Sequence, residues 1–182
     1  MIKKNIYTIC ALSIFLLIAR PVVAVESLSL GGKEFVYQIS SNGGHSFVPA
    51  EQKTNPQWEE KITLIYAGNV TNEEELQSLA IKLRDSYQQK GRLLKALKID
   101  PTENESSKFL LVAVMSGGDA AEAILARVNL ENSSGSVLVY AHRFYGEERG
   151  GNVVGWFEKN GFRMEKEILE FQSVPSESVF LR

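Results

Sequence analysis

The sequence predicts an α+β fold, in which an antiparallel β-sheet carries a long central helix and a shorter C-terminal helix packed on it. One observation is that apolar residues recur in runs of strand length, and these runs follow one another through short turns. Another is a stripe of apolar residues at helical spacing within residues 72–90. Strands joined in this way favour an antiparallel sheet over repeated β-α-β units.

The N-terminus has the three parts of a cleavable signal peptide. Lys3 and Lys4 give it a positive start, an apolar run of about fourteen residues follows, and the run ends before Val22-Val23-Ala24. An uncleaved membrane anchor would need roughly 20 apolar residues. We therefore expect cleavage after Ala24, no stable membrane insertion afterwards, and a periplasmic or secreted protein.

The composition of the mature chain excludes several classes of site and partner. The single cysteine, Cys10, lies in the signal, so disulfides, thiolate metal sites and cysteine nucleophiles are excluded. Losing the three basic residues of the signal moves the formal net charge from −2 to −5, which argues against a nucleic-acid partner. We divide the chain into a signal at 1–24, one domain at 25–172 and a loosely ordered tail at 173–182.

The first half of the domain predicts three strands. Within residues 34–40, Phe35, Tyr37 and Ile39 alternate with Val36 and Gln38, which indicates a strand. Residues 41–44 are turn formers, and residues 45–48 read as the returning strand of a hairpin. Pro49 ends that strand. Residues 60–67 carry apolar side chains on both faces, which is typical of a strand buried on at least one side.

A long helix follows over residues 72–90. Thr71 and Glu74 have the spacing of a capping box, which satisfies backbone N–H groups at a helix start. The apolar stripe consists of Leu76, Leu79, Ala80, Leu83 and Tyr87. Gly91 is expected to end the helix.

Four further strands are predicted at 92–99, 108–115, 120–130 and 137–144. Helix propensity alone leaves a helix open for residues 120–126. The last regular element is a short amphipathic helix, which we expect over about residues 152–159 with Gly161 as its stop. Residues 165–171 then predict either a last strand or a helical turn.

The order of elements and a few residues resemble one known fold family. An early hairpin ends in Phe47-Val48-Pro49, and Trp58-Glu59-Glu60 leads into the strand that begins Lys61-Ile62-Thr63-Leu64-Ile65. With the long helix, the antiparallel meander and the closing helix, this is similar to the Mog1p/PsbP-like fold found in small exported bacterial proteins. The resemblance implies a non-catalytic binding or assembly factor, with no shared catalytic residues to transfer.

Catalytic and cofactor motifs are missing from the sequence. The two histidines do not form an HExxH pair, no GxSxG pentapeptide occurs, and no GxxxxGK[ST] loop is present. The acidic residues lack the regular spacing of a calcium loop. We therefore expect no catalytic residues, no cofactor and no metal.

Aromatic and charged residues around the end of the strand at 137–144 are the candidates for partner binding. They flank a polar loop and would present an apolar patch with charges at its rim to a protein, peptide or glycan. The candidate set is His142, Arg143, Tyr145, Arg149, Trp156 and Trp58. The alternative is structural: an exposed strand face of mixed charge, with Trp156 and Phe157 anchoring the last helix.

Three functions follow from these observations. The first is an exported, soluble, non-catalytic binding or assembly factor. The second is a secreted effector or host-interacting protein, because the signal is compatible with both. The third is a small hydrolase that uses His142 with nearby carboxylates such as Glu147.

Overall fold

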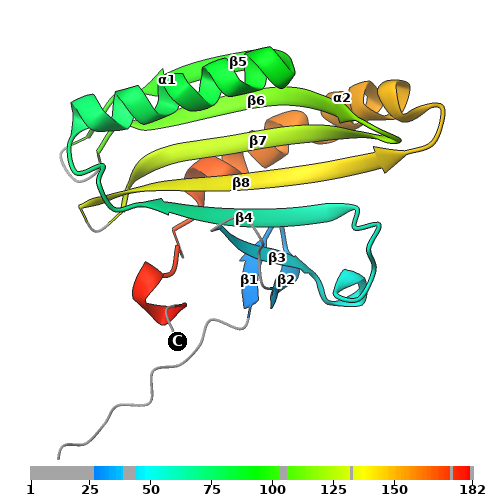
Figure 1. Ribbon diagram of the computed structural model, residues 1–182, viewed down its shortest axis with the longest axis horizontal. Helices are drawn as coiled ribbons and strands as arrows, with labels where there is room; N and C mark the ends of the chain where they lie inside the picture. Colours follow the sequence, from blue (N-terminus) through cyan, green and yellow to red (C-terminus); the bar gives the residue numbers. More distant parts are fainter. Residues whose placement is uncertain (1–26, 39–43, 103–105, 132, 173, 181–182) are drawn as a thin grey trace, which may run out of the picture.

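The computed structural model describes residues 27–38, 44–102, 106–131, 133–172 and 174–180. The expected signal peptide and its cleavage point lie outside the described residues. The described chain forms one eight-stranded sheet in the order β1-β2-β3-β4-β8-β7-β6-β5, and every neighbouring pair is antiparallel. Figure 1 shows this sheet with a helix on each side. The expected α+β class with an antiparallel sheet and two packed helices is confirmed.

The strands agree with the sequence except at the N-terminus. Their bounds are β1 Ser27–Leu30, β2 Lys33–Gln38, β3 His45–Pro49, β4 Glu60–Ala67, β5 Gly91–Ile99, β6 Lys108–Gly117, β7 Ala120–Glu131 and β8 Ser134–Tyr145. Strand β1 was not predicted, because four residues are too few to show an alternation. The helix left open for residues 120–126 is wrong, since β7 pairs with β6 and β8 along its length.

Helix α1, Glu73–Lys90, lies across one face of the sheet, over β5, β6 and β7 (Figure 1). Its inner stripe, with Leu76 and Ala80 buried, packs on the β6–β7 core. The cap is one residue later than predicted: Asn72 accepts the N–H of Glu75 at 3.0 Å, and the Glu75 carboxylate accepts the Thr71 N–H at 2.7 Å. Two orphan N–H groups are thereby satisfied.

Gly91 follows α1 for a reason other than the predicted left-handed stop. Its φ is −162°, an extended angle that any residue adopts. A Cβ there would collide with the Val114 carbonyl oxygen and lie 2.6 Å from the Met115 sulfur. Glycine is required because the backbones of β5 and β6 approach closely at this point.

Helix α2, Arg149–Glu170, covers the opposite face and is 22 residues long, so it is longer than the 18-residue α1. The prediction of a shorter C-terminal helix over 152–159 is wrong, and so is the option of a last strand at 165–171. Gly161 does not stop the helix; it is buried within it, and a Cβ at this position would lie 3.3 Å from the Phe157 ring. A single glycine weakens a helix by only about 1 kcal/mol, and the packing of α2 overrides it.

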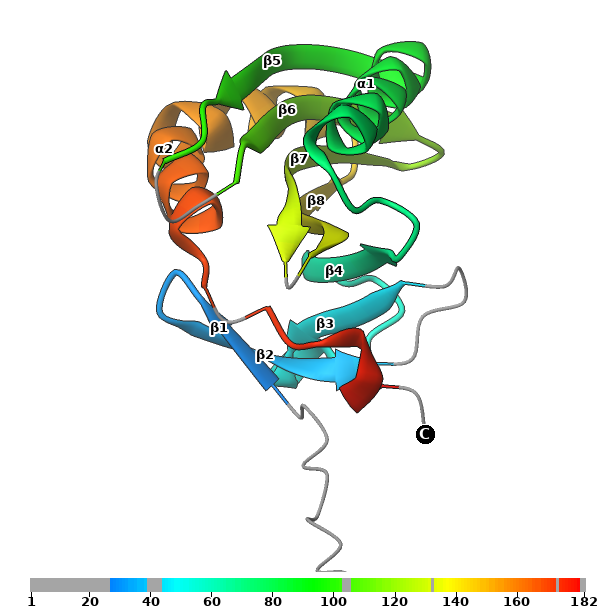
Figure 2. The same cartoon turned by 90° about the vertical axis from the view of Figure 1, so that its left-hand side faces the viewer.

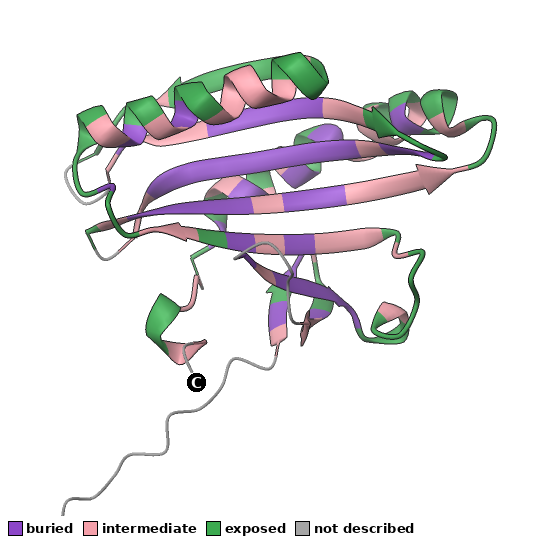
Figure 3. Cartoon of the chain, in the orientation of Figure 1, coloured by how far each residue is buried: buried purple, intermediate pink, exposed green. Residues whose placement is uncertain are grey.

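The sheet curls around α2. The β1–β2 hairpin reaches the C-terminal end of α2, where the Gly31 N–H donates to the Glu167 carboxylate at 3.1 Å. Figure 2 shows β1, β2 and β3 beneath the rest of the sheet, and Figure 3 shows the buried residues concentrated in its central strands. The main core contains Phe35 and Phe47 from the hairpins and Met164 and Ile168 from α2.

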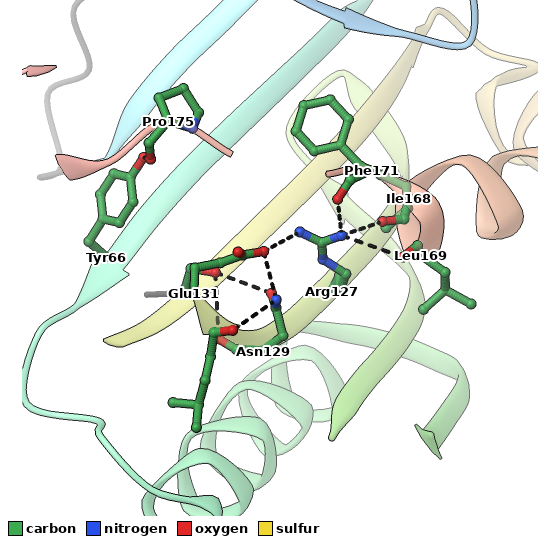
Figure 4. A network of polar contacts seen from close by, with 10 residues as sticks. Tyr66, Arg127, Asn129, Glu131, Ile168, Leu169, Phe171 and Pro175 are labelled. Carbon is green, nitrogen blue, oxygen red and sulfur yellow. Dashed lines mark hydrogen bonds and ion pairs between the residues drawn. The ribbon is translucent and has the colours of Figure 1, made fainter. Parts of the chain in front are cut away.

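Arg127 of β7 is the largest fully buried side chain and is 1% exposed. Its Nη1 donates to the carbonyls of Ile168, at 3.2 Å, and Phe171 at the end of α2 (Figure 4). Its Nη2 pairs with Glu131 at 3.1 Å. The guanidinium thus satisfies carbonyls that the end of any helix leaves without an intrahelical partner.

Residues 174–180, part of the expected loose tail, contact the sheet. The Phe180 ring stacks on His45 with 3.9 Å between centroids, and the Tyr66 hydroxyl donates to the Pro175 carbonyl at 2.5 Å. His45 begins β3, as the predicted returning strand at 45–48 requires, and lies in this aromatic cluster. Among the described residues, no helix is long and apolar enough to cross a membrane.

Candidate functional site

The six predicted binding residues do not form one surface. Successive side chains of β8 point to opposite faces of the sheet. His142 therefore meets Trp156 of α2, with 5.2 Å between ring centroids, whereas Arg143 lies on the α1 face beside Tyr87. Arg149 begins α2, and its Nη1 donates to the Gly146 carbonyl at 2.9 Å. The expected single patch is thus divided between two faces and a loop.

On the α1 face, Trp58 is the centre of a polar cluster. The Arg143 guanidinium carbon lies 3.8 Å from the Trp58 ring centroid, and the Lys61 ammonium lies 3.9 Å from it. The Tyr145 hydroxyl donates to the Trp58 carbonyl at 3.1 Å. Arg143 Nε also donates to the Glu122 carboxylate at 2.7 Å. Arg143 and Tyr145 are therefore already engaged within the molecule.

The pKa of the Lys61 ammonium lies below its ordinary value in this cluster. Burial lowers the pKa of its ammonium, the Glu122 carboxylate opposes that shift, and the neighbouring Arg143 lowers the pKa further. Two cations over one indole gain attraction from the ring, but they repel each other. The cluster holds Trp58 against the sheet, where it packs near Ala113 and Ala141.

On the α2 face, His142 is enclosed by aromatic rings. Phe144 and Trp156 lie 4.6 and 5.2 Å from it by centroid distance, and the Tyr140 hydroxyl is 3.4 Å from His142 Nδ1. The carboxylate beside His142 is that of Glu60, with 3.5 Å between Nδ1 and Oε1. This pairing follows from the register of β4 with β8, in which Glu60 is directly opposite His142.

Glu60 is held in its ionised form. Burial alone raises the pKa of its carboxyl, but hydrogen bonds from His142 and from Lys33, the latter at 2.9 Å, bring the pKa below its ordinary value. Glu147, the carboxylate suggested from sequence, is exposed in the turn after β8. The His142–Glu60 pair suits acid–base chemistry. The small hydrolase suggested from the sequence stays a prediction. Within the described chain, no group of three His, Cys, Asp or Glu residues is placed to hold a metal ion.

A third region, which the sequence reasoning missed, carries exposed apolar side chains beside a groove. The groove has a volume of about 550 Å³ and lies between β5 and the first turns of α2. We call it the β5–α2 groove; its lining includes Leu94, Val114, Val153, Val154, Phe157 and Glu158. Leu94 is 46% exposed and Val154 is 58% exposed. Exposed apolar residues gathered at a groove are typical of a binding surface.

The groove was missed because it depends on strand order and on helix length. The run at 92–99 was read correctly as a strand, but its place at the end of the sheet was not apparent from sequence. The sequence did contain one signal: Leu93, Leu94 and Leu97 lie among basic residues with no strict alternation. Such a pattern is unusual in a strand that has one face in the core.

Comparisons with known proteins do not assign a family. A scan of protein-family models and a search of curated proteins both gave no match. Among solved structures, the human StarD13 (DLC2) lipid transfer and protein localization domain is similar at a TM-score of 0.31 and 9% identity. The alignment covers 78% of this chain and 91% of that one. A likeness at this level carries no functional argument, and the Mog1p/PsbP-like resemblance is left untested.

Proposed function

We propose that this chain is an exported, non-catalytic binding or assembly factor that engages a protein partner through the β5–α2 groove. The observation that carries the proposal is the exposure of Val154 and Leu94 at the two rims of the groove. When a partner covers water-exposed apolar groups at a concave site, the burial favours binding by about 25 cal/mol for each Å² of apolar surface removed from water.

The groove is a stronger candidate than the predicted aromatic surface because its side chains are less engaged. Arg143 is paired with Glu122, and Tyr145 is bonded to the backbone of Trp58. Trp156 of α2 stacks on Tyr140 and His142 of β8. These contacts support structural roles for three of the six predicted residues.

Site-specific photo-crosslinking tests the groove in the cells that make the protein. A photoreactive phenylalanine analogue at Val154 should give a discrete adduct with a partner after irradiation. The matched control is the same analogue at Ile65 of β4, which is 41% exposed but lies far along the sheet order from β5. Adducts of equal yield at both positions, or none at 154, would contradict the proposal.

Export is tested separately by N-terminal sequencing of the protein recovered outside the cytoplasm. We expect the sequence to start at Val25, whereas a start at Met1 would contradict cleavage. Comparison of the periplasmic fraction with the culture supernatant then separates a periplasmic factor from a secreted effector.

A further inference from the structure

Strand β5 is an unpaired edge of the sheet. It is the last strand in the sheet order of the described chain, so its outer side presents the N–H and C=O groups of alternate residues. Seven of its nine residues are exposed. The register with β6 shifts between Leu93 and Lys95, which leaves the five residues from Lys95 to Ile99 as a regular edge. Five residues are the usual length of a strand.

A groove lies on each face of β5, and the two grooves border different parts of the strand. In Figure 2, β5 is at the top of the molecule with α1 on one side and α2 on the other. The β5–α2 groove is on the second side, where it borders Gly91, Arg92 and Leu94 at the start of the strand. On the first side a groove of about 250 Å³ is lined by Ala80, Ile81 and Arg84 of α1 and by Lys98 and Phe109 of the sheet. Because side chains of a strand alternate between faces, a strand added along the whole of β5 would direct one set of side chains to the α1-side groove near Lys98 and the other set to the β5–α2 groove near Leu94.

The charges around β5 specify what kind of strand fits. Its nine residues include Arg92, Lys95 and Lys98 and no acidic residue. Lys95 is paired with Glu165 of α2 at 2.6 Å. The α1-side groove is also lined mainly by apolar residues but has two cations, Lys98 and Arg84, and Arg84 is paired with Asp85 at 2.7 Å.

The α2-side groove is mainly apolar and has a single carboxylate, Glu158, and a single cation, Arg92, in its lining. Apolar side chains of an added strand therefore suit the α2 side, and acidic ones suit the α1 side. A second copy of this chain fits poorly, because pairing β5 with β5 would bring two sets of basic side chains together.

We propose that β5 accepts an extended peptide segment of alternating acidic and apolar residues as a ninth strand of the sheet. This rests on the proposed binding function and defines the partner's chemistry and its mode of binding. Main-chain hydrogen bonds to the edge give the affinity, and the two grooves select the side chains.

The direct test uses a fluorescently labelled ten-residue peptide of alternating Glu and Val, titrated with the protein purified as the cell exports it. Fluorescence anisotropy at low salt should show saturable binding. A peptide of alternating Lys and Val should bind at least about tenfold more weakly, because it places like charges beside Lys98 and Arg84. A peptide with five Glu followed by five Val has the same composition without the alternation, and it should not saturate.

Two N-methylated versions of the Glu–Val peptide test the backbone pairing without changing the protein. One is methylated at the Glu residues and the other at the Val residues. Only every second N–H of an added strand bonds to the edge, so one version should lose binding and the other should keep it. Equal loss or equal retention in the two versions would overturn the ninth-strand mode.

Two variants at exposed positions connect binding to the grooves. Lys98→Glu should weaken the binding of the Glu–Val peptide about three- to tenfold, because it replaces an attraction between charges with a repulsion. Val154→Asp should weaken peptide binding because it places a charge in the β5–α2 groove. Ile65→Asp is the matched control and should leave the affinity unchanged. Far-UV circular dichroism checks that each variant is folded.

The outcomes also separate this inference from the proposed function. Crosslinking at position 154 without saturable peptide binding would leave the groove as a binding site but refute the added strand. In that case the lysines of β5 act to block edge pairing, as they do in many sheets. Concentration-dependent dimerisation, seen by analytical ultracentrifugation and accompanied by no saturable binding of the Glu–Val peptide, would refute the peptide in favour of a second copy.

Discussion

Replacing Arg127 with methionine should destabilise the fold by about 3 kcal/mol, although the change puts an apolar side chain into the core. The guanidinium lies between β7 and the end of α2, where Nη1 donates to the carbonyls of Ile168 and Phe171 (Figure 4). A third carbonyl, that of Leu169, is 3.5 Å away and contributes little. Methionine fills similar space but has no hydrogen to donate.

The magnitude follows from the groups that lose their partner. Each hydrogen bond to a charged group contributes about 1.5–3 kcal/mol, and each buried carbonyl left without a donor costs about 1–3 kcal/mol. Two carbonyls therefore set a loss of roughly 3–6 kcal/mol, and relief from burying the guanidinium offsets part of it. A net loss of about 3 kcal/mol lowers the melting temperature of a domain of this size by roughly 6–12 °C.

Urea denaturation followed by circular dichroism measures the change in the free energy of unfolding. The control is Arg84→Met, because the Arg84 side chain is 42% exposed and pairs with its neighbour Asp85, so its loss should cost less than about 0.5 kcal/mol. Native-state hydrogen exchange should show loss of protection in the last turn of α2. Apolar replacement of a buried ion is neutral in some proteins. An unfolding free energy of Arg127→Met within about 1 kcal/mol of the wild-type value would show that this is such a case, and it would refute the capping role.

Three further predictions concern the backbone, the helix cap and pH. Gly91→Ala should cost about 1–3 kcal/mol of unfolding free energy because its Cβ meets the Val114 carbonyl, whereas Gly155→Ala in the open interior of α2 should stabilise by up to about 1 kcal/mol. Equal effects in urea denaturation would contradict this reading. Asn72→Ala should cost about 1 kcal/mol in the same assay, and a larger loss from Thr71→Val would move the cap back by one residue. Burial lowers the pKa of His45 beneath 6.5, although Glu177 opposes the shift. Folding therefore favours the neutral ring, and melting temperature should fall as pH drops below 6.5. His45→Phe keeps the stacking on Phe180 and should flatten that fall; an unchanged slope would exclude His45 as its source.

The prediction from sequence worked best where local pattern and packing agree. The stripe of α1 and the apolar runs of the central strands place their residues in the core, and the helix cap at Asn72 differs from the prediction by one residue. It failed at α2, where Gly161 was taken as a stop. That glycine is buried within α2, whose Val153, Met164 and Ile168 pack in the core, and this tertiary packing outweighs its low helix propensity.

The candidate site was less accessible to the same reasoning. That His142 and Arg143 lie on opposite faces follows from alternation alone and was available in the sequence. That His142 meets Glu60 was not, because 82 positions separate them and only the pairing of β4 with β8 brings them together. Arg127 has a signal in hindsight, as a single charge in an otherwise apolar run.

The amino-acid sequence alone determined the α+β class, the positions of most strands and the start of the long helix, because these depend on contacts a few residues apart. The tertiary structure alone decided which strand became the edge. A run such as 91–99 has the same local preferences in the middle of a sheet as at its end. Its exposure, and the two grooves beside it, exist because β5 stands at one end of the sheet order, with β1 at the other end, and therefore has one side without a neighbouring strand.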